Sequence, residues 1–156
     1  MNTRIGFGYD SHAFKAGVTL RIGGVTIDHP EGLAGHSDGD VLLHAIIDAL
    51  LGAAGLGDIG KLFPDTDPAL KGISSEAMLS KVLELLEGKW TIVNVDATVI
   101  AEAPKIAPHR DAIQARVAGL TGCRQVNLKA KTNEGLGYVG AREAIECHAV
   151  VELRPA

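Results

Sequence analysis

Apolar residues recur along this chain with two different periods, one typical of strands and one typical of helices. In residues 4–12, the odd positions Ile5, Phe7 and Tyr9 are apolar, while the even positions are glycine, charged or histidine. This period of two predicts a half-buried β-strand. The same alternation predicts three further strands, at residues 91–101, 126–130 and 145–153.

Two features refine the prediction of strands. One set of apolar side chains in residues 91–101 is expected on a single face, namely Val93, Val95, Ala97 and Val99. Residues 18–22 and 25–27 flank the pair Gly23-Gly24, which predicts a small N-terminal hairpin.

Three other segments repeat apolar residues every three to four positions, as helices packed on one side do: residues 38–54, 75–87 and 109–120. Ser37 or Asp38 is available to cap the first of these helices. Strands alternating with helices predict an α/β (α+β) fold. We expect a single layered domain over residues 1–156, with helices packed on one face of a mixed sheet and the hairpin beside it.

Composition narrows the classes of function. A chain of 156 residues is long enough to bury a core as one domain. The net charge of −4 and the lack of clustered lysines and arginines argue against a nucleic-acid partner. No apolar stretch is long enough for a membrane span and no leader precedes Arg4, while two cysteines without C-x-x-C spacing suit a reducing compartment. We therefore expect a cytoplasmic protein with no membrane partner.

Three residues form a candidate metal site. Asp10 and His12 project from one face of the first strand, about 7 Å apart, and His44 lies at the edge of the apolar arc of the first helix. One carboxylate and two imidazoles are the ligand set of an open zinc site that leaves a position for substrate. Each residue alone is also compatible with an ordinary strand end or core-edge histidine; the three together favour the metal site.

The surroundings of these residues suggest how the site is supported. Gly6 and Gly8 are expected to leave the ligand-bearing face of the strand open. Asp40 and Asp48 lie four residues to either side of His44, where either carboxylate could accept the second ring N–H and orient the imidazole.

Several further motifs have both a structural and a functional interpretation. Residues 55–68 form the longest loop without clear periodicity, and its aspartates are typical of turns. His36-Ser37 is compatible with a plain helix cap, and Lys105, between two prolines, with a solvated loop lysine. Glu134 follows a strand and precedes Gly135, which makes it the best carboxylate for a hard, oxygen-preferring cation.

Taken together, these blocks resemble one family over residues 4–153, the 2-C-methyl-D-erythritol 2,4-cyclodiphosphate synthases of the non-mevalonate isoprenoid pathway. The blocks that carry the resemblance are Gly6-x-Gly8-x-Asp10-x-His12, His36-Ser37-Asp38-Gly39-Asp40 with His44, residues 57–67, Ala103-Pro104-Lys105, and Lys129-Ala130-Lys131-Thr132-Asn133-Glu134-x-Leu136-Gly137.

The resemblance implies a homotrimer with active sites between subunits, in which a cytidine diphosphate-linked methylerythritol 2-phosphate cyclises and releases CMP. It implies zinc on Asp10, His12 and His44, and magnesium or manganese held with help from Glu134. His36 and Thr132 match the residues that stabilise the transition state. The residues that match the substrate pocket are Ser37, Asp58, Ile59, Gly60, Phe63, Pro64, Asp65, Thr66, Asp67, Ala101, Ala103, Pro104, Lys105, Lys131, Asn133 and Tyr138.

The chain departs from the family pattern at two places. Lys131-Thr132-Asn133 stands where the family usually has threonines, so an ammonium replaces one hydroxyl. Ala141-Arg142 displaces by one position a basic residue of the family, so a prenyl diphosphate site on the trimer axis is not carried over. Two alternatives to the cyclase remain open at this stage: a zinc phosphoesterase that uses a metal-bound hydroxide, and a metal-stabilised trimeric binding module.

Overall fold

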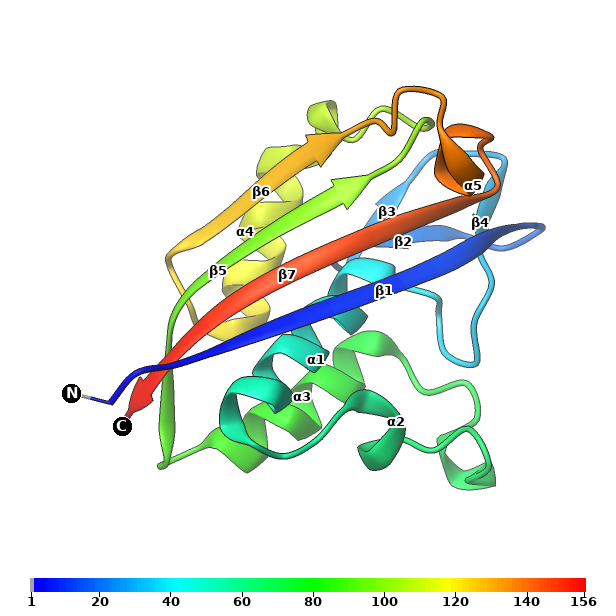
Figure 1. Ribbon diagram of the computed structural model, residues 1–156. Coiled ribbons are helices and arrows are strands. Elements are labelled where there is room, and N and C mark those ends of the chain that lie inside the picture. The colour runs from blue at the N-terminus through cyan, green and yellow to red at the C-terminus, as the bar shows by residue number, and fades with distance from the viewer. Residues whose placement is uncertain (1) are drawn as a thin grey trace.

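The computed structural model describes residues 2–156 and contains a mixed five-stranded sheet in the order β4-β1-β7-β5-β6 (Figure 1). Strands β5 and β6 are parallel, and the other neighbours are antiparallel. Strands β2 and β3 form the separate hairpin predicted around Gly23-Gly24. The strands are β1 (Arg4–Ala16), β2 (Leu20–Ile22), β3 (Val25–Ile27), β4 (Glu31–Leu33), β5 (Trp90–Ile100), β6 (Val126–Lys131) and β7 (Ala144–Pro155).

The long helices α1, α3 and α4 cover one face of this sheet and leave the other uncovered (Figure 1). This arrangement confirms the predicted fold class. The helices are α1 (Val41–Ala54), α2 (Ile59–Leu62), α3 (Ser75–Leu86), α4 (Arg110–Thr121) and α5 (Gly137–Gly140), with 3₁₀ turns η1 (Pro68–Leu70) and η2 (Ala107–His109). The predicted structureless loop at residues 55–68 therefore contains α2 and the start of η1.

The core lies between helix α1 and the central strands. The alternation predicted for the last strand is confirmed, because its inward side chains are at most 1% exposed: Ile145, Cys147, Ala149, Val151 and Leu153. In β5 the prediction for Val93 is wrong. A β-bulge between Ile92 and Asn94 shifts the alternation there, so that Ile92 packs against the core in its place.

Helix α1 begins at Val41, so the predicted cap by Ser37 or Asp38 is wrong. Asp40 is the cap, because its carboxylate accepts a hydrogen bond from the backbone N–H of Leu43 (3.0 Å). The same carboxylate accepts from Gly23 (2.9 Å) and Gly24 (2.7 Å), which ties the hairpin to the helix start. Burial raises the pKa of Asp40 despite these three donors.

The two faces of strand β1 are the reverse of the simple expectation. Ile5 and Phe7 point to the uncovered face of the sheet and are 72% and 61% exposed. Gly6 and Gly8 do not leave their face open: α1 packs directly on them, and a Cβ on Gly8 would lie 1.8 Å from the carbonyl oxygen of Ala45. A period of two identifies the faces of a strand but not which one the core occupies; here the absence of side chains lets a helix backbone approach.

The uncovered face carries a hydrogen-bonded cluster among its apolar side chains. The Tyr138 hydroxyl donates to Glu146 (2.5 Å), and the hydroxyls of Tyr9 and Tyr138 are 3.0 Å apart. His148 Nε2 lies 3.0 Å from the other Glu146 oxygen. None of the helices in the described part of the chain is long and apolar enough to cross a bilayer.

Candidate metal centre and substrate cavity

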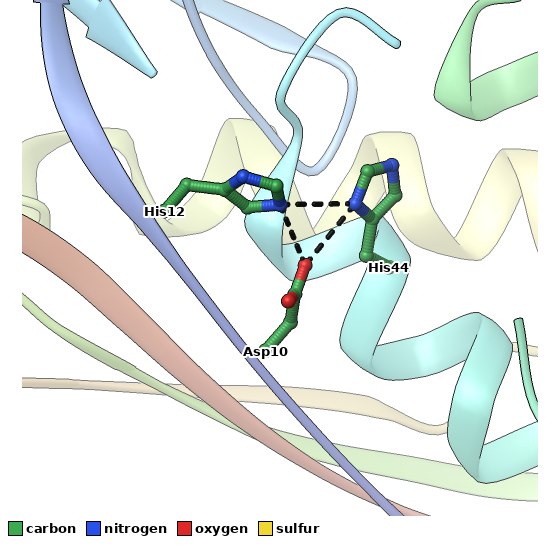
Figure 2. A group of neighbouring side chains, drawn as sticks. All are labelled: Asp10, His12 and His44. Atoms are coloured by element: carbon green, nitrogen blue, oxygen red, sulfur yellow. Dashed lines mark hydrogen bonds and ion pairs between the residues drawn. The ribbon is translucent and has the colours of Figure 1, made fainter. Parts of the chain in front are cut away.

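Asp10, His12 and His44 converge as predicted, and their side chains point toward one another in Figure 2. Strand β1 supplies the first two residues, and α1, packed on the glycines of that strand, supplies His44. Asp10 Oδ2 lies 2.7 Å from His12 Nε2 and 3.1 Å from His44 Nδ1, and the two nitrogens are 3.2 Å apart. Within residues 2–156 no other group of three metal-ligating side chains gathers in this way.

The electrostatics of this triad favour a bound cation. Burial, the largest influence on Asp10, would raise its pKa, but hydrogen bonds and charge from His12 and His44 outweigh burial and lower the pKa to about 2. For His12, burial lowers the pKa, but hydrogen bonding and charge from Asp10 reverse the effect and raise it above the ordinary value. An ionised carboxylate thus stands between two imidazoles, an arrangement that a divalent cation would satisfy.

Each imidazole is oriented by its other nitrogen. His12 Nδ1 donates to the carbonyl oxygen of Ala34 (2.5 Å), which leaves Nε2 facing the triad. His44 Nε2 lies 2.8 Å from Ser75 Oγ and 3.0 Å from Ser37 Oγ, which leaves Nδ1 facing the triad. The atoms that can bind a metal are therefore the three that converge, Asp10 Oδ2, His12 Nε2 and His44 Nδ1. The residues thus fit a metal ion with three protein ligands.

The prediction that Asp40 or Asp48 orients His44 is wrong. Asp40 is fully engaged as the helix cap, and Asp48 accepts instead from the backbone N–H of Ile59 at 2.7 Å. The hydroxyls of Ser75 and Ser37 contact the second ring nitrogen of His44 instead, and the position of Ser75 at a helix start gave no signal of this contact. The partner of His44 depends on the packing of α3 against α1, which the sequence does not show.

The triad opens into a cavity of about 520 Å³. Eight of the predicted catalytic and substrate-binding residues line it: His36, Ser37, Ile59, Phe63, Pro64, Asp65, Thr66 and Asp67. The sequence analysis missed five further lining residues, Pro68, Leu70, Lys71, Ile73 and Met78. The cavity therefore combines an apolar wall with the triad and with charged side chains of both signs, Asp65, Asp67 and Lys71.

Other predicted residues of this region have structural contacts. Asp58 caps α2 by accepting from the N–H of Lys61 (2.8 Å), and neither Asp58 nor Gly60 lines the cavity. Asp67 caps η1 by accepting from the N–H of Ala69 (2.9 Å). His36 is exposed, with Nε2 3.8 Å from Asp65, so its ring reaches out from the cavity rim toward solvent.

The remaining predicted residues gather where β5 and β6 end, and none of them lines the cavity: Ala101, Ala103, Pro104, Lys105, Lys131, Thr132, Asn133 and Glu134. Ser11 pairs with Glu146, Glu146 with Ile100, and Ile100 with Lys131. Three strand spacings therefore separate this second group from the metal-binding edge, about 14 Å. Within one chain the predicted residues therefore form two separate groups, one around the triad and one where β5 and β6 end.

A residue outside the predicted set, Glu102, holds the loop of this second group. One carboxylate oxygen of Glu102 accepts from the backbone N–H groups of Asn133 (2.8 Å) and Gly135 (3.1 Å). Within this loop Thr132 Oγ1 donates to the carboxylate of Glu134 (3.1 Å), and Glu134 has a positive φ of 53°. A strained, clamped loop is typical of a functional segment.

Tyr138 belongs to neither group of residues. Its hydroxyl is bonded to Tyr9 and Glu146 on the uncovered sheet face, so its predicted contact with substrate has no support within one chain.

Comparison with known proteins assigns the family. A 2-C-methyl-D-erythritol 2,4-cyclodiphosphate synthase from Bordetella petrii is 57% identical over 156 residues, covering 98% of this chain and 96% of that protein. The bifunctional IspDF from Campylobacter jejuni superposes with a TM-score of 0.94 at 38% identity, over 99% of this chain; this chain spans 43% of that protein's length. IspF from Plasmodium falciparum, solved as a CDP complex, gives a TM-score of 0.85 at 39% identity over 99% and 97% of the two chains.

These relatives align over almost the whole chain, in agreement with the resemblance inferred from the motifs. The family model described as the YgbB family matches residues 3–154. The chain therefore belongs to the YgbB family, whose members include the 2-C-methyl-D-erythritol 2,4-cyclodiphosphate synthases.

Proposed function

We propose that this protein converts 4-diphosphocytidyl-2-C-methyl-D-erythritol 2-phosphate to 2-C-methyl-D-erythritol 2,4-cyclodiphosphate and CMP, as a phosphorus–oxygen lyase of isoprenoid precursor biosynthesis. An oxygen of the 2-phosphate forms a bond to the β-phosphorus, and the bond from that phosphorus to the oxygen bridging to the α-phosphate breaks, so CMP leaves with that oxygen. The observation that carries the proposal is the convergence of Asp10, His12 and His44 at a cavity in a chain with this ancestry.

The expected metals are one zinc on the triad and one magnesium or manganese near Glu134. The mixed nitrogen and oxygen donors of the triad suit zinc, and an isolated carboxylate suits a hard cation. When bound, such cations neutralise phosphate oxygens and so stabilise the charge of the transition state.

The chain's own residues supply position and hydrogen bonds, which are the main requirements of phosphoryl transfer. Ser37 lies between the triad and the cavity, where its hydroxyl can bind a phosphate oxygen. His36 at the cavity rim and Thr132 on the second loop are donors for the charge that develops on phosphate. The substrate's own 2-phosphate is the nucleophile, so no side chain needs to form a covalent bond.

We propose a homotrimer in which the metal half-site of one subunit faces the loop of Thr132 and Glu134 from its neighbour. The separation of the two half-sites within one chain supports this arrangement. The exposed apolar side chains of the uncovered sheet face, Ile5, Phe7 and Val150, support burial of that face between subunits. Two free, buried cysteines are consistent with a cytoplasmic protein.

Complementation between inactive variants tests the shared site. His12→Ala removes one half-site, and a Thr132→Ala/Glu134→Ala double variant removes the other. Coexpressed in equal amounts, they should recover roughly a quarter of wild-type activity, because random trimers pair two intact halves at about one interface in four. His12→Ala with His44→Ala is the control and should recover nothing. If the first mixture is also inactive, the site is not shared between subunits.

Phosphorus NMR of the reaction tests the chemistry. The cytidine substrate with zinc and magnesium should yield a cyclic diphosphate together with CMP. Inorganic phosphate or a linear product would instead support a zinc phosphoesterase. A zinc-loaded trimer that binds the substrate without turnover would support a binding module and refute the cyclase.

A further inference from the structure

The nitrogen of His44 that faces away from the triad contacts the buried Ser75, which in turn contacts the half-buried Asp38. Ser75, the first residue of α3, is completely buried, and its hydroxyl oxygen lies 2.8 Å from His44 Nε2. The Asp38 carboxylate lies on the other side of this serine: one oxygen contacts the Ser75 hydroxyl and the other accepts from the Ser75 backbone N–H at 3.2 Å. None of these contacts involves Asp10 or His12.

The direction of each hydrogen bond follows from the chemistry of the groups. The Asp38 carboxylate accepts hydrogen bonds, so the single proton of the Ser75 hydroxyl is donated to it. The oxygen of Ser75 can then only accept, and the donor that faces it is Nε2–H of His44. This arrangement places the imidazole proton of neutral His44 on Nε2 and leaves the lone pair of Nδ1 to accept from Nε2–H of His12, 3.2 Å away, or to bind a metal.

We propose that Asp38 and Ser75 are positioning residues that hold His44 in the Nε2–H tautomer required to bind the metal. The inference rests on the proposed zinc site. Neither residue was among the predicted site residues.

Ser37 is the competing candidate, because its hydroxyl lies 3.0 Å from the same nitrogen. Ser37 lines the cavity, whereas Ser75 does not. Asp38, the carboxylate in this chain of contacts, accepts a hydrogen bond from the Ser75 hydroxyl. The hydroxyl oxygens of Ser37 and Ser75 are 3.5 Å apart. Ser75 is therefore the permanent partner of His44, and Ser37 stays available to the substrate.

The contact also links three separate segments of the chain. Asp38 belongs to the loop between β4 and α1, Ser75 begins α3, and His44 lies in the first turn of α1. Without the Ser75 hydroxyl, Nε2–H of His44 would have only Ser37 as its partner. The loop that carries Ser37 would also lose one of its contacts with α3, the one between Asp38 and the Ser75 hydroxyl. Loss of a partner behind a metal-bound histidine typically lowers metal affinity about 10- to 100-fold.

Zinc affinity of the purified full chain tests the proposal, measured by competition with a chromophoric chelator. Ser75→Ala should weaken zinc binding about 10- to 100-fold, and Asp38→Ala should weaken it in the same direction. Asp38→Asn keeps one oxygen acceptor for the Ser75 hydroxyl but turns its NH2 toward the Ser75 backbone N–H, so its zinc affinity should lie between those of Asp38→Ala and wild type. Ser74→Ala is the matched control: Ser74 caps α3 by accepting from the N–H of Ala77 (3.1 Å), so its loss should lower stability without changing zinc affinity.

A second measurement separates positioning from simple destabilisation. In metal-free protein, the ¹⁵N chemical shifts of His44 should report the Nε2–H tautomer in wild type and a mixture of tautomers in Ser75→Ala. If Ser75→Ala matches wild type in both zinc affinity and tautomer, the proposal is wrong. If wild type and His44→Ala bind zinc equally, the metal site itself is wrong, which is a distinct result.

Discussion

Replacing Gly8 with alanine would push strand β1 and helix α1 apart at the place where both carry the candidate metal ligands. A Cβ at this position would lie 1.8 Å from the carbonyl oxygen of Ala45 and 2.8 Å from the amide nitrogen of Ala49. Both atoms belong to the helix backbone, so no side-chain rotation relieves the clash. His44 precedes Ala45 directly, and Asp10 is two residues from Gly8, so any relief separates the ligands.

The size of the effect follows from these distances. Real Cβ contacts essentially never fall below 3.0 Å, so helix and strand must separate by about 1.2 Å, the difference between 3.0 Å and 1.8 Å. Overpacking of a core costs about 1–3 kcal/mol, and the upper end applies here because backbone must move. Zinc sites tolerate about 0.2 Å in ligand distance. We therefore expect Gly8→Ala to lose about 3 kcal/mol of stability and zinc affinity by more than about 100-fold, beyond the effect of losing an orienting partner.

The assay combines urea denaturation with zinc titration. Gly52→Ala is the control, because Gly52 lies in the same helix with open space: the nearest atom to its added Cβ is the Phe7 carbonyl oxygen at 4.0 Å. Alanine there should raise stability by up to about 1 kcal/mol and leave zinc affinity unchanged. If Gly8→Ala keeps the stability and zinc affinity of wild type, α1 does not pack closely on β1. If Gly8→Ala and Gly52→Ala lose equally, the close contact is not located at Gly8.

Two further outcomes are expected. Glu102→Ala should raise the KM for the cytidine substrate by up to about 30-fold, because two hydrogen bonds of about 1 kcal/mol each that order residues 132–136 are lost. Zinc content should not change, and a loss of zinc would contradict the separation of the two groups. Burial would raise the pKa of Glu146, but hydrogen bonds from Tyr138 and His148 outweigh it and lower the pKa below the ordinary 4.5. The stabilising contribution of ionised Glu146 is therefore complete above pH 4.5 and disappears as pH falls through the lowered pKa. Glu146→Gln should therefore flatten the acid side of a plot of urea midpoint against pH. An unchanged slope would show that Glu146 does not contribute to this pH dependence.

Most of the architecture was predictable from local pattern. The alternation in β7, the apolar arc of α1 and the double glycine of the hairpin each report a preference that a few neighbouring residues create by themselves. The convergence of Asp10, His12 and His44 was also predictable, because a strand with period two and one helical stripe leave few ways to place three metal-ligating side chains.

Most of the errors share a physical cause, because they concern contacts between distant segments. Alternation along β1 could not tell that the glycine face is the buried one, since this depends on the approach of α1. Asp40 and Asp48 were predicted to orient His44 from helical spacing, yet both carboxylates bond elsewhere, to Gly23, Gly24 and Ile59.

By itself, the sequence determined the element types, the candidate metal-ligating set and the family motifs, because these depend on side-chain chemistry and short-range periodicity. Only the tertiary structure decided that Ser75 lies behind His44, that Glu102 holds the loop of Glu134, and that the two groups of predicted residues lie on different strands of one sheet. Those outcomes depend on strand order and helix packing, which join residues far apart in the chain through geometry that no local pattern encodes.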